Sequence, residues 1–373
     1  MIPSITAVRM TGARNRAELP LLVLGPSLGT SATTLWTAAA AAGLTDVFDV
    51  VAWDLPGHGH NRSAPDEPFT MAELATGVLR VVDDLVAERG EVGGGFAYAG
   101  VSVGGAVGLH LLLKTPGRVS SAVLLCTGAR LGDEASWADR IERVDASGTP
   151  GLVAASSERW FGAGFLERER ETGSALLNAL RSADDDAYVL VCGALADHDV
   201  RNRLAEIRVP VLAVAGAEDV AAPPEKLREI AEGVKDGRYV ELPGVAHLAP
   251  AEAPGTVARL VREHVLGDSA PTIDFSREFQ DLITQSASGD LWSRPGLDRG
   301  SRALISLTAL VARGRHEELE PHVRAALRSG LGEDEIRELL LQTAVYCGVP
   351  DASTAFRIAQ RVIDEESGRP ASR

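Results

Sequence analysis

The sequence predicts an α/β fold, with a parallel sheet covered by helices, followed by a smaller all-α domain. Short apolar segments alternate with helical ones from about residue 20 to residue 265, and beyond that point helix follows helix without a strand candidate. The chain has 373 residues, more than one hydrophobic core usually supports. We therefore expect two domains, residues 1–268 and 269–373.

The strands of the first domain are expected at short, mostly apolar segments, some of them closed by turn signals. Helices are expected between them, notably at 71–89, where apolar residues recur near a period of 3.6, and at 105–114. Strands separated by helices imply a parallel sheet that binds its ligand at the strands' carboxyl ends. The six predicted strands are residues 21–24, 49–53, 96–99, 122–125, 211–215 and 238–242.

A long insertion interrupts this alternation at about residues 128–205, where charged, helix-forming sequence replaces the strand signal. We expect it to form a helical cap above the carboxyl ends of the strands. The second domain is predicted to contain four clear helices, at 302–313, 321–329, 333–346 and 352–366.

Composition excludes several classes of protein. The formal net charge is −15 and the basic residues form no clustered stripe, so no nucleic acid partner is expected. Cys126, Cys192 and Cys347 lie far apart, which fits neither a disulfide framework nor a zinc finger, and no metal site is expected. The N-terminus shows no signal-peptide pattern and no apolar run is long enough to span a membrane. We expect a soluble, cytoplasmic protein that does not bind membranes.

A candidate nucleophile, Ser102, lies in Gly100-Val101-Ser102-Val103-Gly104, between a predicted strand and a predicted helix. This setting is typical of a nucleophile elbow, in which a Cβ at either glycine would crowd neighbouring chain. The alternative is a glycine-rich turn with an incidental serine.

A serine needs a base to take its proton. His247 follows the last predicted strand and Asp219 the one before it, so both can converge on Ser102. The chain order Ser, Asp, His is typical of α/β-hydrolases, and their Gly-x-x-Asp pattern favours Asp219 over the neighbouring Glu218. The developing oxyanion would bind the backbone N–H groups of Val103 and Leu28.

The remaining histidines of this domain are expected to have structural roles. His58 and His60 are predicted to shape a loop, with substrate contact as the alternative. His110, His198 and His264 are expected at the surface or in packing contacts. Asp197-His198-Asp199 is predicted to lie on a helix with a solvated face, because three consecutive helical residues cannot face one metal ion together.

The first domain resembles the 3-oxoadipate enol-lactone hydrolases. The resemblance rests on the elbow, on Asp219 and His247, and on further motifs at 27–30, 53–59 and 159–161. It departs from the family at Pro26-Ser27, where Asn-Ser is more frequent, and at Leu55-Pro56. The resemblance implies a lactone substrate that contacts Arg159 and Trp160 in the cap. Arg159 would pair with the substrate's free carboxylate, or alternatively lie on the cap surface.

The second domain resembles the 4-carboxymuconolactone decarboxylases. The matching motifs lie at 292–298, 322–327 and 342–350, and the resemblance spans nearly all of residues 272–366. It implies an alkylhydroperoxidase-like helical fold that assembles into homo-oligomers. Pro350 stands where peroxidases of this fold have the second cysteine of Cys-x-x-Cys, so disulfide-cycling peroxidase chemistry is not expected.

Decarboxylation of this kind must stabilise a dienolate and deliver a proton to carbon, which requires no cofactor. The candidates are His316, His322, Glu335 and Cys347. His322 borders an apolar stripe, so its side chain is expected to lean inward, as a proton donor or as a buried structural histidine. The alternatives for Glu335 and Cys347 are a helix N-terminal acid and an inert buried thiol. At position 354, where relatives often have histidine, this chain has Thr354.

The two implied activities are consecutive, because the decarboxylase makes the enol-lactone that the hydrolase opens. The hypothesis is a bifunctional enzyme acting on small lactones. One alternative is a serine esterase or haloperoxidase-like hydrolase of another substrate, with a C-terminal domain that serves only oligomerisation. Another is a ligand receptor without turnover.

Overall fold

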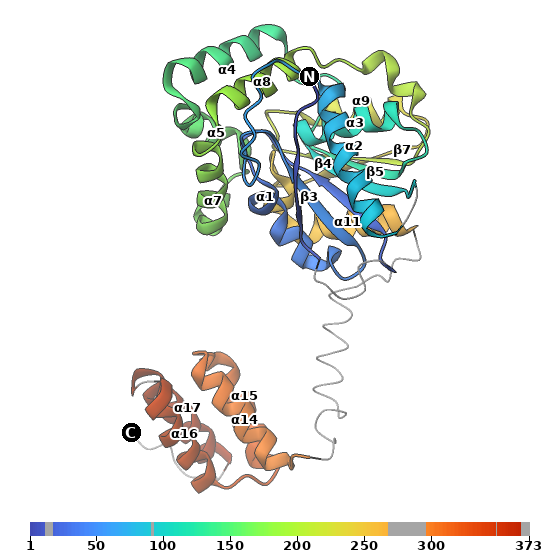
Figure 1. Cartoon of the computed structure of the whole chain (residues 1–373). Helices are drawn as coiled ribbons and strands as arrows, with labels where there is room; N and C mark the ends of the chain where they lie inside the picture. Colours follow the sequence, from blue (N-terminus) through green and yellow to red (C-terminus); the bar gives the residue numbers. More distant parts are fainter. Residues whose placement is uncertain (12–17, 91–92, 268–295, 348, 367–373) are drawn as a thin grey trace. The chain divides into compact units, whose positions relative to one another are not determined.

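The structure is a computed structural model that describes residues 1–11, 18–90, 93–267, 296–347 and 349–366 (Figure 1). The chain forms two compact units, Met1–Pro271 and Thr272–Arg373. Within the described ranges, no helix is both long and apolar enough to cross a membrane.

The N-terminal unit is built on a seven-stranded sheet with the order β1-β3-β2-β4-β5-β6-β7. All six predicted strands are present, and each pairs in parallel with its neighbour among them. The predicted parallel sheet is confirmed for these six strands, and a seventh strand that the sequence did not predict, β1, pairs antiparallel with β3 at the edge. The strands are β1 Thr6–Arg9, β2 Leu21–Gly25, β3 Asp49–Asp54, β4 Phe96–Val101, β5 Val119–Leu125, β6 Val211–Gly216 and β7 Gly237–Leu242.

Helices cover the sheet so completely that every residue of β2, β3, β4 and β6 is buried. The predicted helix at 71–89 is α2 (Met71–Glu88), which begins at a capping box formed by Thr70 and Glu73 and buries an apolar stripe. The other helices that cover the sheet are α1 Ala32–Ala39, α3 Val103–Lys114, α9 Pro224–Gly233, α10 Ala249–Glu252 and α11 Pro254–Leu266.

The predicted helical cap lies between β5 and β6, and Figure 1 shows its helices gathered in one group beside the sheet. A 3-10 helix, Arg201–Glu206, leads from the cap back to β6. Of the solvated helix face expected at residues 197–199, the helix is wrong, because α8 ends at Ala196 and His198 is buried, whereas Asp197 and Asp199 are exposed. The cap helices are α4 Glu134–Ser147, α5 Val153–Trp160, α6 Phe165–Arg168, α7 Arg170–Arg181 and α8 Asp185–Ala196.

The C-terminal unit contains the four predicted helices, packed around their own apolar core. The second one begins five residues earlier than predicted, so Pro321 lies inside the helix instead of at its start. The helices are α14 Arg299–Ala312, α15 His316–Arg328, α16 Glu333–Cys347 and α17 Val349–Glu366.

Candidate active site

Ser102 lies at the turn between β4 and α3 with a φ of 54° and a ψ of −117°. A positive φ is unfavourable for a residue with a Cβ and persists only where surrounding contacts impose it. Here the Ser102 N–H donates to the Leu125 carbonyl at 3.0 Å, and the Ser102 carbonyl accepts from Thr127 Oγ1 at 2.7 Å. These bonds hold the serine in the strained geometry of a nucleophile elbow.

The glycines on either side of Ser102 are required by the close approach of backbone to backbone. A Cβ on Gly100 would lie 2.4 Å from the Gly104 carbonyl oxygen, and one on Gly104 would lie 2.6 Å from the carbonyl oxygen of Pro26. The Gly104 N–H donates to that Pro26 oxygen at 2.9 Å. The elbow is therefore bound directly to the loop that follows β2.

His247 and Asp219 form a buried pair. His247 Nδ1–H donates to Asp219 Oδ2 at 2.8 Å, and the other carboxylate oxygen accepts the N–H groups of Ala221 and Ala222 at 2.8 and 2.9 Å. The pair fixes the imidazole tautomer and leaves Nε2 as the basic nitrogen. Glu218, the competing acid, instead accepts the Ala163 N–H at 2.9 Å.

A pocket between the sheet and the cap brings these groups together. Ser102, His247 and Leu28 line it from the sheet side, and Arg159 and Trp160 line it from the cap. The structure thus places all of these sequence-predicted residues around one cavity. The other lining residues are Ser27, Leu131, Gly132, Ser136, Trp137, Arg140, Ser156 and Ala221.

Two backbone N–H groups are available for an oxyanion. Val103 is the first residue of α3, so its N–H has no acceptor within the helix. In the part of the chain that the structure describes, the N–H of Leu28 donates to no protein acceptor, whereas that of the neighbouring Ser27 donates to Thr30 Oγ1 at 3.1 Å. Leu28 and Val103 are thus suited to the predicted role.

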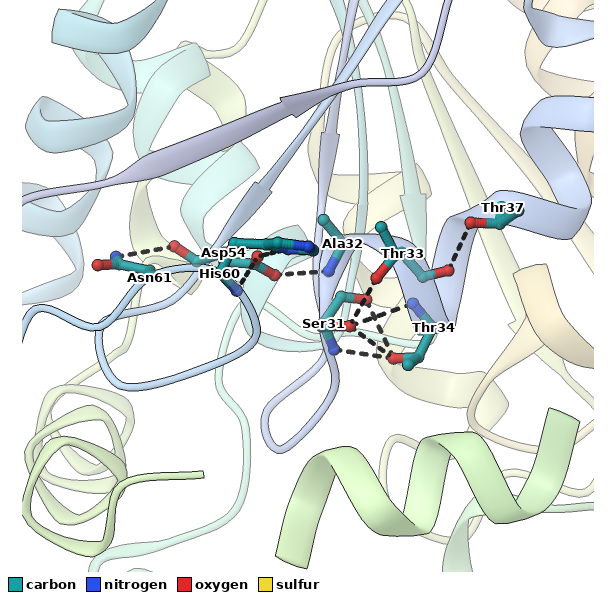
Figure 2. Close-up of polar contacts among 8 residues, drawn as sticks. All are labelled: Ser31, Ala32, Thr33, Thr34, Thr37, Asp54, His60 and Asn61. Atoms are coloured by element: carbon teal, nitrogen blue, oxygen red, sulfur yellow. Dashed lines mark hydrogen bonds and ion pairs between the residues drawn. The ribbon is translucent and has the colours of Figure 1, made fainter. Parts of the chain in front are cut away.

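Asp54 connects the start of α1 to the loop after β3, as Figure 2 shows. One of its oxygens accepts the Ala32 N–H at the start of α1, at 2.6 Å, and the other accepts the His60 N–H at 2.8 Å and contacts the His60 ring. The Asp54 carbonyl accepts from Asn61 Nδ2 at 3.2 Å. His58 stacks on Tyr188 and bonds the Pro56 carbonyl, so both histidines shape this loop, as expected.

Arg140 also lines the pocket, and no motif in the sequence marks it. Its Nε and Nη2 donate to the Tyr188 hydroxyl at 2.9 and 2.5 Å. Burial, together with the nearby charge of Arg140, lowers the pKa of Arg159. Among the described residues, neither arginine forms an ion pair. Two positive charges without a carboxylate partner are suited to binding an anion.

The candidates of the C-terminal unit are not gathered in the same way. His322 is exposed and its Nδ1–H donates to the Glu318 carbonyl at 2.7 Å, so the expectation that it leans inward is wrong. Glu335 Oε2 accepts the Gly332 N–H at 2.8 Å near the start of α16, and Glu335 lines a surface pocket. His316 is the half-buried first residue of α15. Cys347 ends α16, and its side chain lies outside the described residues.

The parallel sheet, the elbow and the Asp219–His247 pair define a serine hydrolase of the α/β type. The model of the alpha/beta hydrolase family matches residues 22–260, more than half of the chain, which belongs to that family. The model of the carboxymuconolactone decarboxylase family matches residues 277–361. The protein is thus a fusion of an alpha/beta hydrolase with a domain of the carboxymuconolactone decarboxylase family.

Individual relatives agree with both assignments. The chain is 31% identical over 204 residues to 3-oxoadipate enol-lactonase 2 of Acinetobacter baylyi, a match that covers 55% of this chain and 73% of that protein. It is 40% identical over 92 residues to the 4-carboxymuconolactone decarboxylase of the same organism, covering 25% of this chain and 69% of that protein.

A solved structure, the enol-lactonase from Burkholderia xenovorans, matches with a TM-score of 0.65 and 29% identity. That match covers 70% of this chain and 96% of the enol-lactonase.

Proposed function

We propose that the protein is a bifunctional enzyme of aromatic catabolism, in the 3-oxoadipate pathway. Its C-terminal domain decarboxylates 4-carboxymuconolactone, and its N-terminal domain hydrolyses the resulting enol-lactone to 3-oxoadipate. The observation that carries the hydrolase assignment is the buried Asp219–His247 pair, whose histidine lines one pocket with the strained Ser102. Relatives of both activities match separate parts of the chain.

In the hydrolysis, Ser102 Oγ attacks the lactone carbonyl while His247 Nε2 takes its proton. Asp219 holds the imidazole and stabilises its protonated form. The N–H groups of Leu28 and Val103 bind the oxyanion of the tetrahedral intermediate. Ring opening leaves an acyl-enzyme whose enolate leaving group takes the proton from His247. His247 then activates a water that releases the product.

The substrate's free carboxylate would bind Arg159 and Arg140, both on the cap side of the pocket. Long-range attraction does not favour this binding, because the whole chain carries a formal net charge of −15. A local pair of guanidinium groups supplies the attraction that the whole molecule lacks. Trp160 would provide an apolar wall against the lactone ring.

In the decarboxylation, loss of CO2 leaves a dienolate that takes a proton at carbon. The candidate donors and stabilising groups are His316, His322, Glu335 and Cys347. Glu335 has the best structural support, because its pocket also presents the polar side chains of Thr308 and Gln342. The chemistry requires no metal or organic cofactor.

The test supplies 4-carboxymuconolactone to the whole protein and to its Ser102→Ala variant, with CO2 and product followed separately. The wild-type protein is expected to release CO2 and form 3-oxoadipate, and the variant to release CO2 and accumulate enol-lactone. Lactone hydrolysis at the wild-type rate in Ser102→Ala would show that the nucleophile is assigned wrongly. Absence of CO2 release from both proteins would refute the decarboxylase assignment.

The C-terminal domain is also proposed to form a homo-oligomer. Large apolar side chains are exposed on two of its helices, with Val345 and Tyr346 showing 77% and 84% exposure and Ile305 and Leu341 about half. Apolar surface of this kind is typical of a protein interface. Val345→Lys together with Tyr346→Ser should reduce the mass measured by light scattering to that of a smaller species, and an unchanged mass would contradict the proposal.

We also propose a cytoplasmic location, which the buried free thiols of Cys126 and Cys192 support.

A further inference from the structure

The loop that carries His247 is bonded to a short segment of the cap, residues 160–163, which begins with the last residue of α5. The Trp160 carbonyl accepts the N–H groups of His247 and Leu248 at 3.1 and 3.3 Å. The Ala163 N–H donates to Glu218, whose own N–H donates to the Val245 carbonyl at 2.9 Å. The cap segment and the histidine loop are thus connected at both ends of the segment.

Glu252, on α10, bonds to both sides of this connection. Its Oε1 accepts the N–H groups of Ala246 and Leu248, the two neighbours of His247, at 3.1 and 3.2 Å. Its Oε2 accepts the N–H of Gly162 in the cap segment at 2.7 Å. One carboxylate therefore holds the backbone before and after His247 and the cap at the same time.

The fit around Gly162 is close. A Cβ at this position would lie 2.9 Å from the Gly244 carbonyl oxygen, 3.0 Å from Glu218 Oε2 and 3.2 Å from Glu252 Oε2. These distances are shorter than ordinary contacts, so a side chain here would push the cap segment away from the histidine loop. The glycine allows the carboxylate to reach the backbone of the cap.

The charge of Glu252 lies in a largely buried setting. Burial raises the pKa of Glu252, while its three backbone hydrogen bonds and the His247 side chain act in the opposite direction. The other titratable groups around the histidine loop are Asp219, Glu218 and Cys126. Asp219 bonds His247 directly, Glu218 bonds the cap, and Cys126 Sγ–H donates to the Ala246 carbonyl at 3.5 Å.

We infer that Glu252 is a positioning residue for His247, which holds the base in register with the cap and stabilises its protonated form with a second negative charge. This inference rests on the proposed role of His247 as the general base. Arg159 immediately precedes the bonded segment, and Trp160 is its first residue. Both side chains line the pocket. A substrate that binds these two side chains would therefore also restrain the loop of the base.

Two substitutions separate the geometric effect from the electrostatic one. Glu252→Gln keeps the length of the side chain but removes the charge and places an N–H donor against one of the backbone N–H groups. Glu252→Asp keeps the charge but is too short to bridge the loop and the cap. The matched control is Glu263→Gln, which alters a partly exposed glutamate paired with Arg259 on α11.

The main measurement is the rate at which a fluorophosphonate labels Ser102, as a function of pH, together with kcat/KM for the enol-lactone. We expect both Glu252 variants to be labelled about tenfold more slowly than wild type, corresponding to about 1.4 kcal/mol in barrier height. In Glu252→Gln the acid limb of the pH profile should move to lower pH, because a negative charge that favours protonated His247 is gone. In Glu252→Asp the limb should stay in place, and Glu263→Gln should match wild type.

Labelling within twofold of wild type in either folded Glu252 variant would overturn the inference. A slower rate in Glu252→Gln without a shift of the acid limb would also overturn it, since a purely structural role predicts that result. If melting curves show that these variants do not fold, Gly162→Ala becomes the test. It keeps every charge and crowds the same contact, so unchanged labelling there would refute the inference.

The labelling assay does not depend on the lactone substrate. If wild type is labelled in a Glu252-dependent manner but does not open the enol-lactone, the proposed substrate is wrong and the positioning role stands. If wild type opens the lactone and the Glu252 variants do so equally well, the positioning role is wrong and the proposed function stands.

Discussion

The two units of the chain present their candidate residues in opposite ways. In the N-terminal unit, Ser102, Asp219 and His247 come from three distant loops at the carboxyl ends of the strands, and Asp219 and His247 are hydrogen-bonded to each other and buried. In the C-terminal unit, His322 and Glu335 lie exposed on separate helices. The difference shows that the loops at one edge of a parallel sheet can bring catalytic side chains together within one unit. In the small helical bundle, the candidate side chains instead remain exposed to solvent on separate helices.

The largest effect is expected from Asp219→Asn. An Asn amide turned toward His247 Nδ1 would favour the wrong imidazole tautomer, so lactone hydrolysis should fall by about 10⁴-fold, the loss seen for this change in a serine protease. Decarboxylation in the other unit should stay at the wild-type rate. The two activities are measured in separate assays, with Asp139→Asn, an exposed residue paired with Arg143, as the control. A parallel loss of both activities would contradict the independence of the two sites.

The next prediction is that the hydrophobic cores of the two units unfold independently. Leu24 in β2 and Leu307 in α14 are 0% and 1% exposed. Truncation of either to alanine should cost about 3 kcal/mol of unfolding free energy, since it leaves a cavity. Calorimetry should show that Leu24→Ala lowers only the melting transition of the N-terminal unit and Leu307→Ala only that of the C-terminal unit. If each variant moves both transitions, the units are coupled thermodynamically.

A smaller effect is expected from the arginines of the pocket. Arg140→Gln and Arg159→Gln should each raise KM for the carboxylated lactone by about tenfold, because a charge-assisted hydrogen bond contributes roughly 1.5–3 kcal/mol. Hydrolysis of a neutral aryl ester should change little. Arg143→Gln is the control, since Arg143 lies on α4, the helix that carries Arg140, and pairs at the surface with Asp139. An equal loss with both substrates would show that the arginines hold the cap and not the carboxylate.

The smallest effect concerns the stability of the N-terminal unit at low pH. His110 Nε2–H donates to His198 Nδ1 at 3.1 Å, and His198 Nε2–H donates to the Gly128 carbonyl at 3.1 Å. Burial, with the neighbouring charges of Arg203 and Lys114, lowers the pKa of His110 to about 4, against 6.5 for an unperturbed histidine.

The unfolded chain thus binds this proton more readily than the folded one, so stability present above pH 6.5 is lost as the pH falls toward 4. His110→Gln removes this group from the titration and should flatten the loss, with a difference of a few degrees in melting temperature near pH 5. Calorimetry between pH 5 and 7.5 gives the comparison, and the transition of the C-terminal unit is the internal reference. An unchanged slope would contradict the prediction.

The sequence predicted the features that depend on local pattern. The strands that precede Ser102 and Asp219 are short apolar runs, the strand that precedes His247 mixes apolar and charged residues, and the glycines at 100 and 104 mark the elbow. The fold of the N-terminal unit and the composition of its candidate site could therefore be anticipated. The edge strand β1 could not, because its four half-buried residues carry no distinctive period.

Features that depend on tertiary packing escaped prediction. Nothing near Arg140 in the sequence indicates that its side chain points into the pocket, since this depends on how α4 packs against α8 and Tyr188. His198 packs against His110, as one of its two expected roles allows, but it lies in the turn after α8 and not on the expected solvated helix face. His322 was expected to lean inward and is exposed instead. Apolar neighbours along a helix do not determine the direction in which a side chain at the edge of the apolar stripe points.

The way in which the two ends of the cap join the sheet has a consequence for how substrate preference could evolve. The cap leaves from β5 and returns to β6, which are neighbours in the sheet, and its two ends are joined by a hydrogen bond from the Val200 N–H to the Ala129 carbonyl at 2.9 Å. Loop-closure entropy rises slowly with length, by about 0.6 kcal/mol for each doubling. A cap of different length could therefore be grafted between β5 and β6 at little thermodynamic cost, provided that it keeps the segment at 160–163 that bonds to the histidine loop. The rest of the cap is then a module through which substrate preference could evolve without rebuilding the sheet.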